Sequence, residues 1–268
     1  YPEVEQVPGE IDSAIITVPA RVMSEVTEEC GRKGVKGLIV ITSGFGEVGR
    51  KDLEDEMLAI AARYGMRVLG PNIVGSLSNS DKFNGSFAPG LPFPGKASLI
   101  TQSGALLIAI DMATYTKRIG FDKLISIGNM ADVDFADLIE WFDEDENTTC
   151  VSLYIEGMKN GRKFIDAARK SKKPIVALKS GVSAHGSAAA ASHTGSLAGA
   201  AKVYTSAFKQ AGVIQAADLN DLFNRTLTLS QQPPMKGENL LILTNGGGVG
   251  VLATDAAEKY GIPLHLAP

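Results

Sequence analysis

Short runs of apolar residues alternate with longer helical stretches along the whole sequence, and this alternation constrains the fold more than any other feature. Runs such as KGLIVIT (36–42) and KPIVALK (173–179) are apolar nearly throughout, which is typical of parallel strands that helices cover on both faces. We expect strands at 12–18, 36–42, 66–70, 96–101, 122–127, 149–155, 173–179 and 239–244. We expect helices at roughly 20–31, 50–64, 104–119, 132–146, 158–172, 196–211, 217–230 and 248–260. The sequence therefore predicts an α/β protein built from doubly wound parallel sheets.

Two segments rich in turn residues divide the 268 residues into three parts. FAPGLPFPG (87–95) carries three prolines, which cannot continue a helix or an inner strand, and QQPPMKGE (231–238) is the second such segment. The first part has no opening β-α-β unit, and the last part holds one strand and one helix. Because a single such unit cannot bury its own sheet face, we expect both end parts to be pieces of larger domains.

Composition and charge narrow the functional class. The formal net charge of −4 leaves no broad basic face for nucleic-acid phosphates, so nucleic acid is not expected as the main partner. No apolar run reaches the roughly 18 residues that a membrane span needs, and the first residues do not resemble a signal peptide. Cys30 and Cys150 are far apart and predict buried thiols in a reducing compartment. We expect a cytoplasmic protein without a membrane partner.

A histidine, His193, lies in a segment with very little side-chain bulk. Of the 21 residues from 180 to 200, 17 are Gly, Ala, Ser or Thr, and the segment follows a predicted strand. It thus leaves the carboxyl edge of a parallel sheet, where ligand sites of such sheets lie. No His or Cys cluster offers further metal ligands, so a nucleophile that accepts a phosphoryl group is favoured over a metal site. The alternative is a flexible Ala/Ser loop with an incidental histidine.

Two further features indicate phosphate chemistry. In LITQSGALLIAI (99–110), Ser103 and Gly104 stand where a helix begins, and helix amino termini present free N–H groups to anions. Glu156 follows a strand end, and a carboxylate there can orient an imidazole. Each feature has a simpler alternative, namely ordinary N-capping by Ser103 and a charge–dipole interaction of Glu156.

Taken together, the motifs resemble a known family. The chain resembles the α subunit, or α-like part, of the NDP-forming acyl-CoA synthetases, which include ADP-forming acetyl-CoA synthetase and are relatives of succinyl-CoA synthetase. The motifs that carry the resemblance are GPNIVGSLS (70–78), LITQSGAL (99–106), SIGNMADVDFADLIEWF (126–142), YIEG (154–157), SHTGSLAG (192–199) and TNGGGVGVLATDA (244–256).

The resemblance implies three domains and a partner. Residues 1–93 would be the later part of a Rossmann-like CoA-binding domain, 94–236 a flavodoxin-like ligase domain with a phosphohistidine loop, and 237–268 the beginning of a further ligase domain. The glycine-rich turn for the CoA pyrophosphate and the ATP-grasp domain of the family are not in the sequence. ATP or ADP with Mg²⁺ would therefore bind on a β subunit or a fused ATP-grasp domain, and a hetero-oligomer is expected.

The resemblance also implies roles for individual residues. His193 would be the phosphohistidine and Glu156 would orient it. The residues implied to hold phosphate are Gln102, Ser103 and Gly104, and those implied to line the CoA site are Val18, Pro19, Ala20, Ile41, Thr42, Ser43 and Asn72. Asn129 is a polar turn residue near the same sheet edge. For Asn72 the alternative is an ordinary turn residue after Pro71.

The implied reaction interconverts acyl-CoA, ADP and phosphate with a carboxylic acid, CoA and ATP, through an acyl phosphate and a phosphohistidine. The ligands would be CoA, a small carboxylic acid and phosphate, with no dedicated metal site in this chain. Two alternatives remain open from the residues. One is a succinyl-CoA synthetase-like ligase, and the other is a non-catalytic module that senses CoA or acyl-CoA, which would not need His193.

Overall fold

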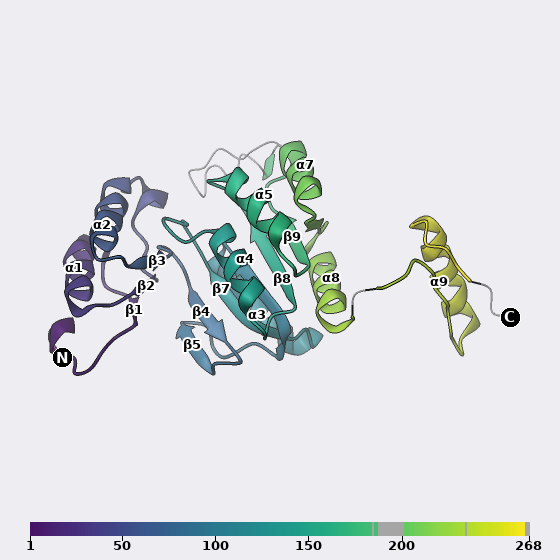
Figure 1. Ribbon diagram of the computed structural model, residues 1–268, viewed down its shortest axis with the longest axis horizontal. Helices are drawn as coiled ribbons and strands as arrows, with labels where there is room; N and C mark the ends of the chain where they lie inside the picture. Colours follow the sequence, from purple (N-terminus) through teal and green to yellow (C-terminus); the bar gives the residue numbers. More distant parts are fainter. Residues whose placement is uncertain (184, 187–200, 234, 266–268) are drawn as a thin grey trace. The chain divides into compact units, whose positions relative to one another are not determined.

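The computed structural model describes residues 1–183, 185–186, 201–233 and 235–265 (Figure 1). The chain forms two compact units, Tyr1–Gln231 and Gln232–Pro268. The larger unit contains a three-stranded and a seven-stranded sheet. No helix in the described part of the chain combines the length and apolar character needed to cross a membrane.

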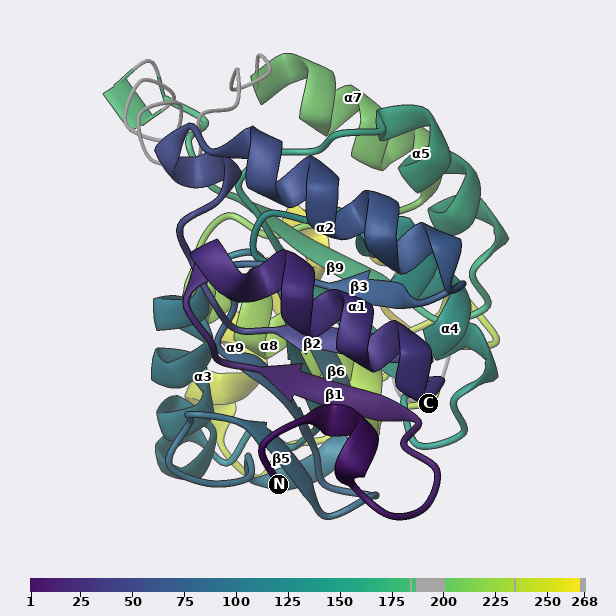
Figure 2. The same cartoon turned by 90° about the vertical axis from the view of Figure 1, so that its left-hand side faces the viewer.

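A three-stranded parallel sheet, ordered β1-β2-β3, forms the amino-terminal part of the larger unit. Helices α1 and α2 lie side by side over one face of it (Figure 2). Met23 and Cys30 recur at helical spacing on α1 and are buried in one core with Leu38, Met57 and Val68. The elements are η1 (Val4–Gln6), β1 (Ser13–Ile16), η2 (Ala20–Val22), α1 (Met23–Lys33), β2 (Gly37–Val40), η3 (Gly46–Val48), α2 (Lys51–Arg63) and β3 (Arg67–Leu69).

The seven-stranded sheet has the order β10-β9-β8-β6-β7-β4-β5. The strands from β10 to β7 run parallel, whereas β4 pairs antiparallel with both β7 and β5. Its elements are β4 (Gly75–Ser78), β5 (Phe83–Ser86), β6 (Pro94–Thr101), α3 (Gly104–Lys117), β7 (Phe121–Ser126), α4 (Phe135–Glu144), β8 (Cys150–Ile155), α5 (Gly161–Lys170), β9 (Ile175–Lys179), α7 (Ala201–Ala211), β10 (Ile214–Gln215) and α8 (Leu219–Gln231).

Helices cover both faces of this sheet, and neighbouring strand residues point to opposite faces. On the central strand β6, Ile100 packs in a core with residues of α4, α5 and α7, such as Phe142 and Phe164. Its neighbour Leu99 packs in a second core with residues of α3 and α8, such as Leu107. This two-sided burial explains the uninterrupted apolar strands in the sequence, and it confirms the doubly wound α/β fold.

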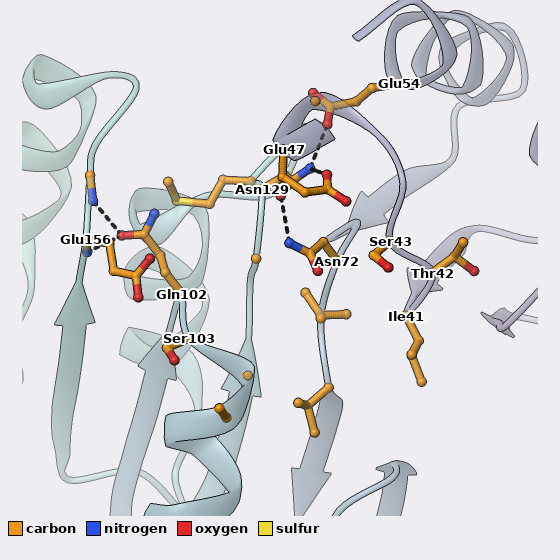
Figure 3. Close-up of a pocket in the computed structure, with 18 of the residues that line it drawn as sticks. Ile41, Thr42, Ser43, Glu47, Glu54, Asn72, Gln102, Ser103, Asn129 and Glu156 are labelled. Atoms are coloured by element: carbon orange, nitrogen blue, oxygen red, sulfur yellow. Dashed lines mark hydrogen bonds between the residues drawn. The ribbon is translucent and has the colours of Figure 1, made fainter. Parts of the chain in front are cut away.

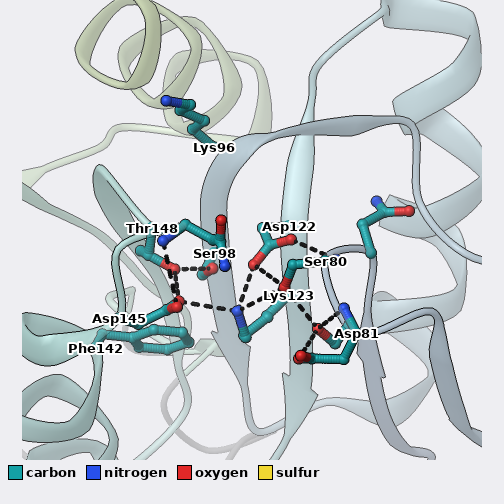
Figure 4. Close-up of polar contacts among 12 residues, drawn as sticks. Ser80, Asp81, Lys96, Ser98, Asp122, Lys123, Phe142, Asp145 and Thr148 are labelled. Carbon is teal, nitrogen blue, oxygen red and sulfur yellow. Dashed lines mark hydrogen bonds and ion pairs between the residues drawn. The ribbon is translucent and has the colours of Figure 1, made fainter.

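A buried polar cluster lies at the amino-terminal ends of the parallel strands, at the opposite edge from the carboxyl ends (Figure 4). Lys123 of β7 forms ion pairs with Asp122 and, at 2.9 Å, with Asp145 after α4. Thr148 donates to Asp145 at 2.6 Å and lies 2.7 Å from the hydroxyl of Ser98 on β6. Burial acts to raise the pKa of Asp145, but the hydrogen bonds from Thr148 and Lys123 hold it below its usual value. The Lys123–Asp145 ion pair thus links the first residues of β7 to the end of α4.

The structure departs from the sequence-based expectations at β10, a two-residue strand that was not predicted, and in two larger respects. The sheet is mixed because β4 and β5 form an antiparallel hairpin, which the sequence analysis did not predict since these short strands carry polar and glycine residues. The strand predicted at 239–244 is wrong: within the described part of the smaller unit, Leu240 forms only an isolated bridge with Leu264 beside α9 (Gly247–Lys259). Among the described residues of this unit there is no sheet for the segment to join, and Leu243 is 85 % exposed.

Leu99 of β6 tests how far stability depends on the two-sided core. The side chain is fully buried, so we expect Leu99→Ala to lower the free energy of unfolding by about 2–5 kcal/mol through lost burial and a residual cavity. Urea unfolding followed by far-UV circular dichroism measures this. Val203→Ala on the exposed surface of α7 is the control and should change stability by less than about 0.5 kcal/mol. Equal losses in both variants would contradict the expectation.

The two thiols are buried, as the sequence predicted, and we expect them to be unreactive. Burial raises the pKa of Cys150 to about 12 and also raises that of Cys30, so very little thiolate forms at pH 8. Iodoacetamide at pH 8 should therefore leave the folded chain unmodified and should label both cysteines after unfolding in urea, as read by mass spectrometry. Rapid labelling of the folded protein would contradict this.

Candidate active site

A pocket of about 880 Å³ lies at the carboxyl ends of strands from both sheets (Figure 3). Its walls are the turns after β2 and β3 of the first sheet, and the turns after β6, β7 and β8 of the second. Open α/β sheets place their ligands at this edge, since the strand-to-helix turns there leave backbone groups and polar side chains uncovered. The pocket brings together Ile41, Thr42, Ser43, Asn72, Gln102, Ser103, Gly104 and Glu156 from the predicted phosphate and CoA groups.

Gln102 is held in a fixed orientation. Its side-chain oxygen Oε1 accepts hydrogen bonds from the backbone N–H of Glu156 at 2.6 Å and of Gly157 at 2.9 Å. Two N–H donors require an acceptor, so the amide orientation follows from the contacts. The Gln102 amide nitrogen therefore remains as the donor on this pocket-lining side chain, which suits an anion such as phosphate.

The beginning of α3 forms the adjoining part of the pocket. Ser103 is the N-cap residue, and its hydroxyl accepts a hydrogen bond from the backbone N–H of Leu106 at 3.3 Å. The next residue is glycine because a Cβ at Gly104 would lie 2.6 Å from Cγ2 of Val74. The first N–H groups of a helix have no intrahelical acceptor and carry a partial positive charge. The Ser103 side chain thus has a capping role here, and the helix terminus supplies anion donors beside it.

Glu156 directly follows β8 and lies at the same part of the pocket as Gln102 and Ser103 (Figure 3). Its backbone is fixed at both polar groups: the N–H binds Gln102, and the carbonyl accepts from Nζ of the buried Lys179 at 2.8 Å. Burial lowers the pKa of Lys179, and the negative charge of Glu156 partly offsets this. The carboxylate is therefore carried on a residue whose backbone is hydrogen-bonded on both sides. His193, which it is predicted to orient, lies outside the described residues.

The predicted CoA-site residues divide into two sets. Ile41, Thr42 and Ser43 line the pocket at the end of β2, and Thr42 Oγ1 donates to the carbonyl of Val18 at 2.6 Å. The VPA segment itself, Val18 to Ala20, is not among the described residues that line the pocket. Within the described part of the chain, only the Val18 carbonyl of this segment hydrogen-bonds to the pocket wall, through Thr42, so the structure brings together only part of the predicted CoA site.

Asn72 and Asn129 meet across the pocket. The backbone of Asn72 has a positive φ of 62°, which asparagine tolerates better than most residues, and its side-chain nitrogen donates to Oδ1 of Asn129 at 3.3 Å. Asn129 Nδ2 in turn donates to Glu47 at 2.7 Å and to Glu54 at 3.1 Å. Burial acts to raise the pKa of Glu47, but hydrogen bonds from Asn129 and nearby backbone N–H groups hold it below the usual value.

Four charged residues line the pocket without having been predicted from the sequence: Glu47, Lys51, Glu54 and Lys159. A signal for Glu54 was present. On α2 it shares one helical stripe with Met57 and Ala61, where an apolar side chain is the usual choice, and it is 3 % exposed. Glu47, Lys51 and Lys159 have no such pattern, because turn and surface charges are common in any sequence.

Two family models match the chain. One, described as a CoA binding domain, matches residues 1–77, and the other, described as a succinyl-CoA ligase like flavodoxin domain, matches residues 94–229. The second model covers half of the chain and includes the Gln102 turn, the Asn129 turn and Glu156.

Curated relatives are similar to this protein over almost the whole chain. The α subunit of acetate–CoA ligase [ADP-forming] I from Pyrococcus furiosus is 49% identical over 99% of this chain and 58% of its own length. Acetate–CoA ligase [ADP-forming] from Methanocaldococcus jannaschii is 47% identical over 98% of this chain and 38% of its own length. The chain thus spans little more than half of the first relative and less than half of the second.

Among solved structures, the dinucleotide forming acetyl-coenzyme A synthetase 1 of Ca. Korarchaeum cryptofilum, in complex with phosphate and ADP, superposes with a TM-score of 0.95. It is 46% identical and is covered over 59% of its chain, against 100% of this one. The chain therefore belongs to the family described as the succinyl-CoA ligase like flavodoxin domain, and the relatives that it matches over almost its whole length are named ADP-forming acetate–CoA ligases.

Proposed function

We propose that this chain supplies the CoA-binding and phosphate-binding part of an ADP-forming acyl-CoA ligase. The observation that carries the proposal is the single pocket in which the Gln102 amide, the amino terminus of α3 and Glu156 face the CoA-side residues Ile41 to Ser43. The reaction begins only when phosphate lies next to the thioester. A pocket with hydrogen-bond donors for an anion on one wall and the predicted CoA-site residues on the other would bring the two together. The division into domains 1–93, 94–236 and 237–268 stays a prediction.

Relatives support a small carboxylic acid as the second substrate. Two relatives with 47–49% identity are named acetate–CoA ligases [ADP-forming], whereas a succinate–CoA ligase α subunit from Archaeoglobus fulgidus is 25% identical over 69% of the chain. We therefore favour an acetate-type acid over a succinate-type one. The first relative is named as an α subunit, so we propose a β subunit, or an ATP-grasp domain fused to this chain, as the nucleotide-binding partner.

The proposed chemistry has three transfers. An oxygen of hydrogen phosphate attacks the thioester carbonyl carbon of acyl-CoA; a C–O bond forms, the C–S bond breaks, and the released proton goes to the CoA thiolate. A ring nitrogen of His193 then attacks phosphorus of the acyl phosphate, and the carboxylate leaves. Finally an oxygen of the ADP β-phosphate attacks phosphorus, the P–N bond breaks, and ATP forms. Covalent catalysis by histidine thus divides one transfer between distant sites into two.

The residues of this chain have distinct roles in the proposal. Gln102 and the first N–H groups of α3 hold phosphate and stabilise negative charge in the transition state, and Glu156 orients His193. Mg²⁺ would accompany the nucleotide on the partner, where it neutralises phosphate charge. We propose a cytoplasmic location for the reaction, as the sequence analysis predicts.

Gln102→Glu tests the phosphate role. The new carboxylate can still accept from the N–H groups of Glu156 and Gly157, but it places an acceptor with negative charge where the amide donor was. We expect the KM for phosphate to rise about tenfold or more while the KM for CoA, in the reverse direction, changes little. Steady-state kinetics of the complete enzyme measure both. Gln231→Glu at the exposed end of α8 is the control, and a phosphate KM that rises equally there would contradict the role.

Glu156→Gln tests the orienting role and the phosphohistidine together. A neutral amide supports the tautomer and developing charge of His193 less well, so we expect ATP-dependent phosphorylation to slow at least about tenfold. Quench-flow labelling with ATP measures the rate, and His193→Asn should abolish the acid-labile label. The control Glu140→Gln removes an exposed carboxylate of α4 and should label at the parent rate. Label that persists in His193→Asn would overturn the proposed phosphohistidine.

A further inference from the structure

One asparagine side chain joins the two sheets across the pocket. The carboxamide of Asn129, in the turn after β7, donates to Glu47 Oε2 at 2.7 Å and to Glu54 Oε2 at 3.1 Å, and it accepts from Asn72 at 3.3 Å (Figure 3). Glu47 follows β2, Glu54 lies on α2, and Asn72 follows β3. Three segments of the part with the three-stranded sheet therefore contact one side chain of the part with the seven-stranded sheet, called here the ligase-like part.

The carboxamide is suited to this junction by its chemistry. An amide offers two N–H donors and one acceptor oxygen, and all three functions are used here. A lysine could bridge two carboxylates but has no acceptor for Asn72. Glu54 is buried and also pairs with Lys51 at 3.3 Å. The hydrogen bond from Asn129 and the ion pair with Lys51 together offset the cost of removing its carboxylate from water.

The backbone beside Asn129 fixes the junction further. The N–H of Asn129 donates to the carbonyl of Pro71 at 3.0 Å, and that of Ala131 donates to Gly70 at 2.9 Å. A Cβ at Gly128 would lie 2.3 Å from the carbonyl oxygen of Asn72, so the two turns can approach this closely only because residue 128 is glycine. The turns after β3 and β7 are thus held at a defined separation on the pocket rim.

We propose that Asn129 is a positioning residue that sets the CoA-side wall of the pocket against the phosphate-binding turn at Gln102. This inference rests on the proposed function. Attack of phosphate on the thioester needs both walls aligned, because the nucleophile is held by one and the thioester by the other. Transfer between ATP and His193 needs only the ligase-like part and the nucleotide-binding partner. The two half-reactions therefore depend on Asn129 to different degrees.

Asn129→Asp separates the half-reactions. The substitution replaces both N–H donors by an oxygen with negative charge facing two carboxylates, at nearly the same side-chain volume. In the complete enzyme, we expect labelling of the histidine from acetyl-CoA and labelled phosphate to slow at least about tenfold, and labelling from ATP to stay within about twofold of the parent. Asn224→Asp, on the exposed surface of α8, is the control and should leave both rates unchanged.

A reciprocal exchange tests the contact itself. In Asn129→Asp combined with Glu47→Gln, the new glutamine amide can donate to the new carboxylate, while its oxygen still accepts from the N–H groups of Gly44 and Phe45. In the reaction from acetyl-CoA and phosphate, we expect the double variant to lose less rate than the two single losses combined, as a coupled pair requires.

The outcomes distinguish the two levels of the proposal. Loss of both half-reactions in Asn129→Asp, retention of both, or additive losses in the double variant would overturn the positioning role. A parent enzyme that is labelled neither by ATP nor by acetyl-CoA with phosphate would instead overturn the proposed function. A slower reaction only from acetyl-CoA, rescued in part by the exchange, supports Asn129 as the positioning residue.

Discussion

Burial of the seven-stranded sheet on both faces is the constraint on which the rest of the larger unit depends. Leu99 and Ile100 point into different cores, so helices must cover both sides of β6. The larger polar clusters lie where the strands end, and a polar group on a face needs a buried partner, as Ser152 of β8 has in Thr226 of α8 at 2.6 Å. The pocket occupies the carboxyl edge and the Lys123 cluster occupies the amino edge. The position of the site thus follows from hydrophobic burial before any particular polar residue is considered.

Neutral amides organise the pocket more than charges do. Gln102 accepts two backbone hydrogen bonds from the end of β8, and Asn129 bridges two carboxylates while accepting from Asn72. An amide fixes geometry without adding net charge. The Gln102 amide can therefore donate to an anionic ligand without being paired to a carboxylate. Lys51 and Glu54, two charged side chains at the pocket, pair with each other instead.

Much of the fold was predictable because it rests on local patterns. Apolar runs indicated the parallel strands, and Ser103 before Gly104 indicated the beginning of α3, which the structure confirms. The hairpin of β4 and β5 was not predictable in this way, since its pairing depends on β7 and not on its own sequence. For the same reason the apolar segment at 239–244 was mistaken for a strand, because a strand forms only where a neighbouring strand is available.

The individual residues of the site were easier to predict from the sequence than the contacts between them. Sequence reasoning placed Ser43, Gln102 and Glu156 at strand ends, and the pocket brings them together. The contact of Asn129 with Glu47 joins residues 82 positions apart, and nothing in either local sequence encodes that distance. Glu54 could have been noticed as a charge in an apolar helical stripe, but its partner could not be named without the three-dimensional structure.

The charged cluster at the amino edge has a consequence for strand alignment. All six residues of β7 are buried, so apolar burial alone would tolerate a shift of this strand past its neighbours. A shift by one residue, however, would turn the Lys123 ammonium to the opposite face of the sheet, away from Asp145. The cost of an unpaired buried ammonium would then oppose the shift. Lys123, together with the buried Asp122 that accepts from Ser80, thereby selects one register for β7, and this register keeps the Asn129 turn at its place on the pocket rim.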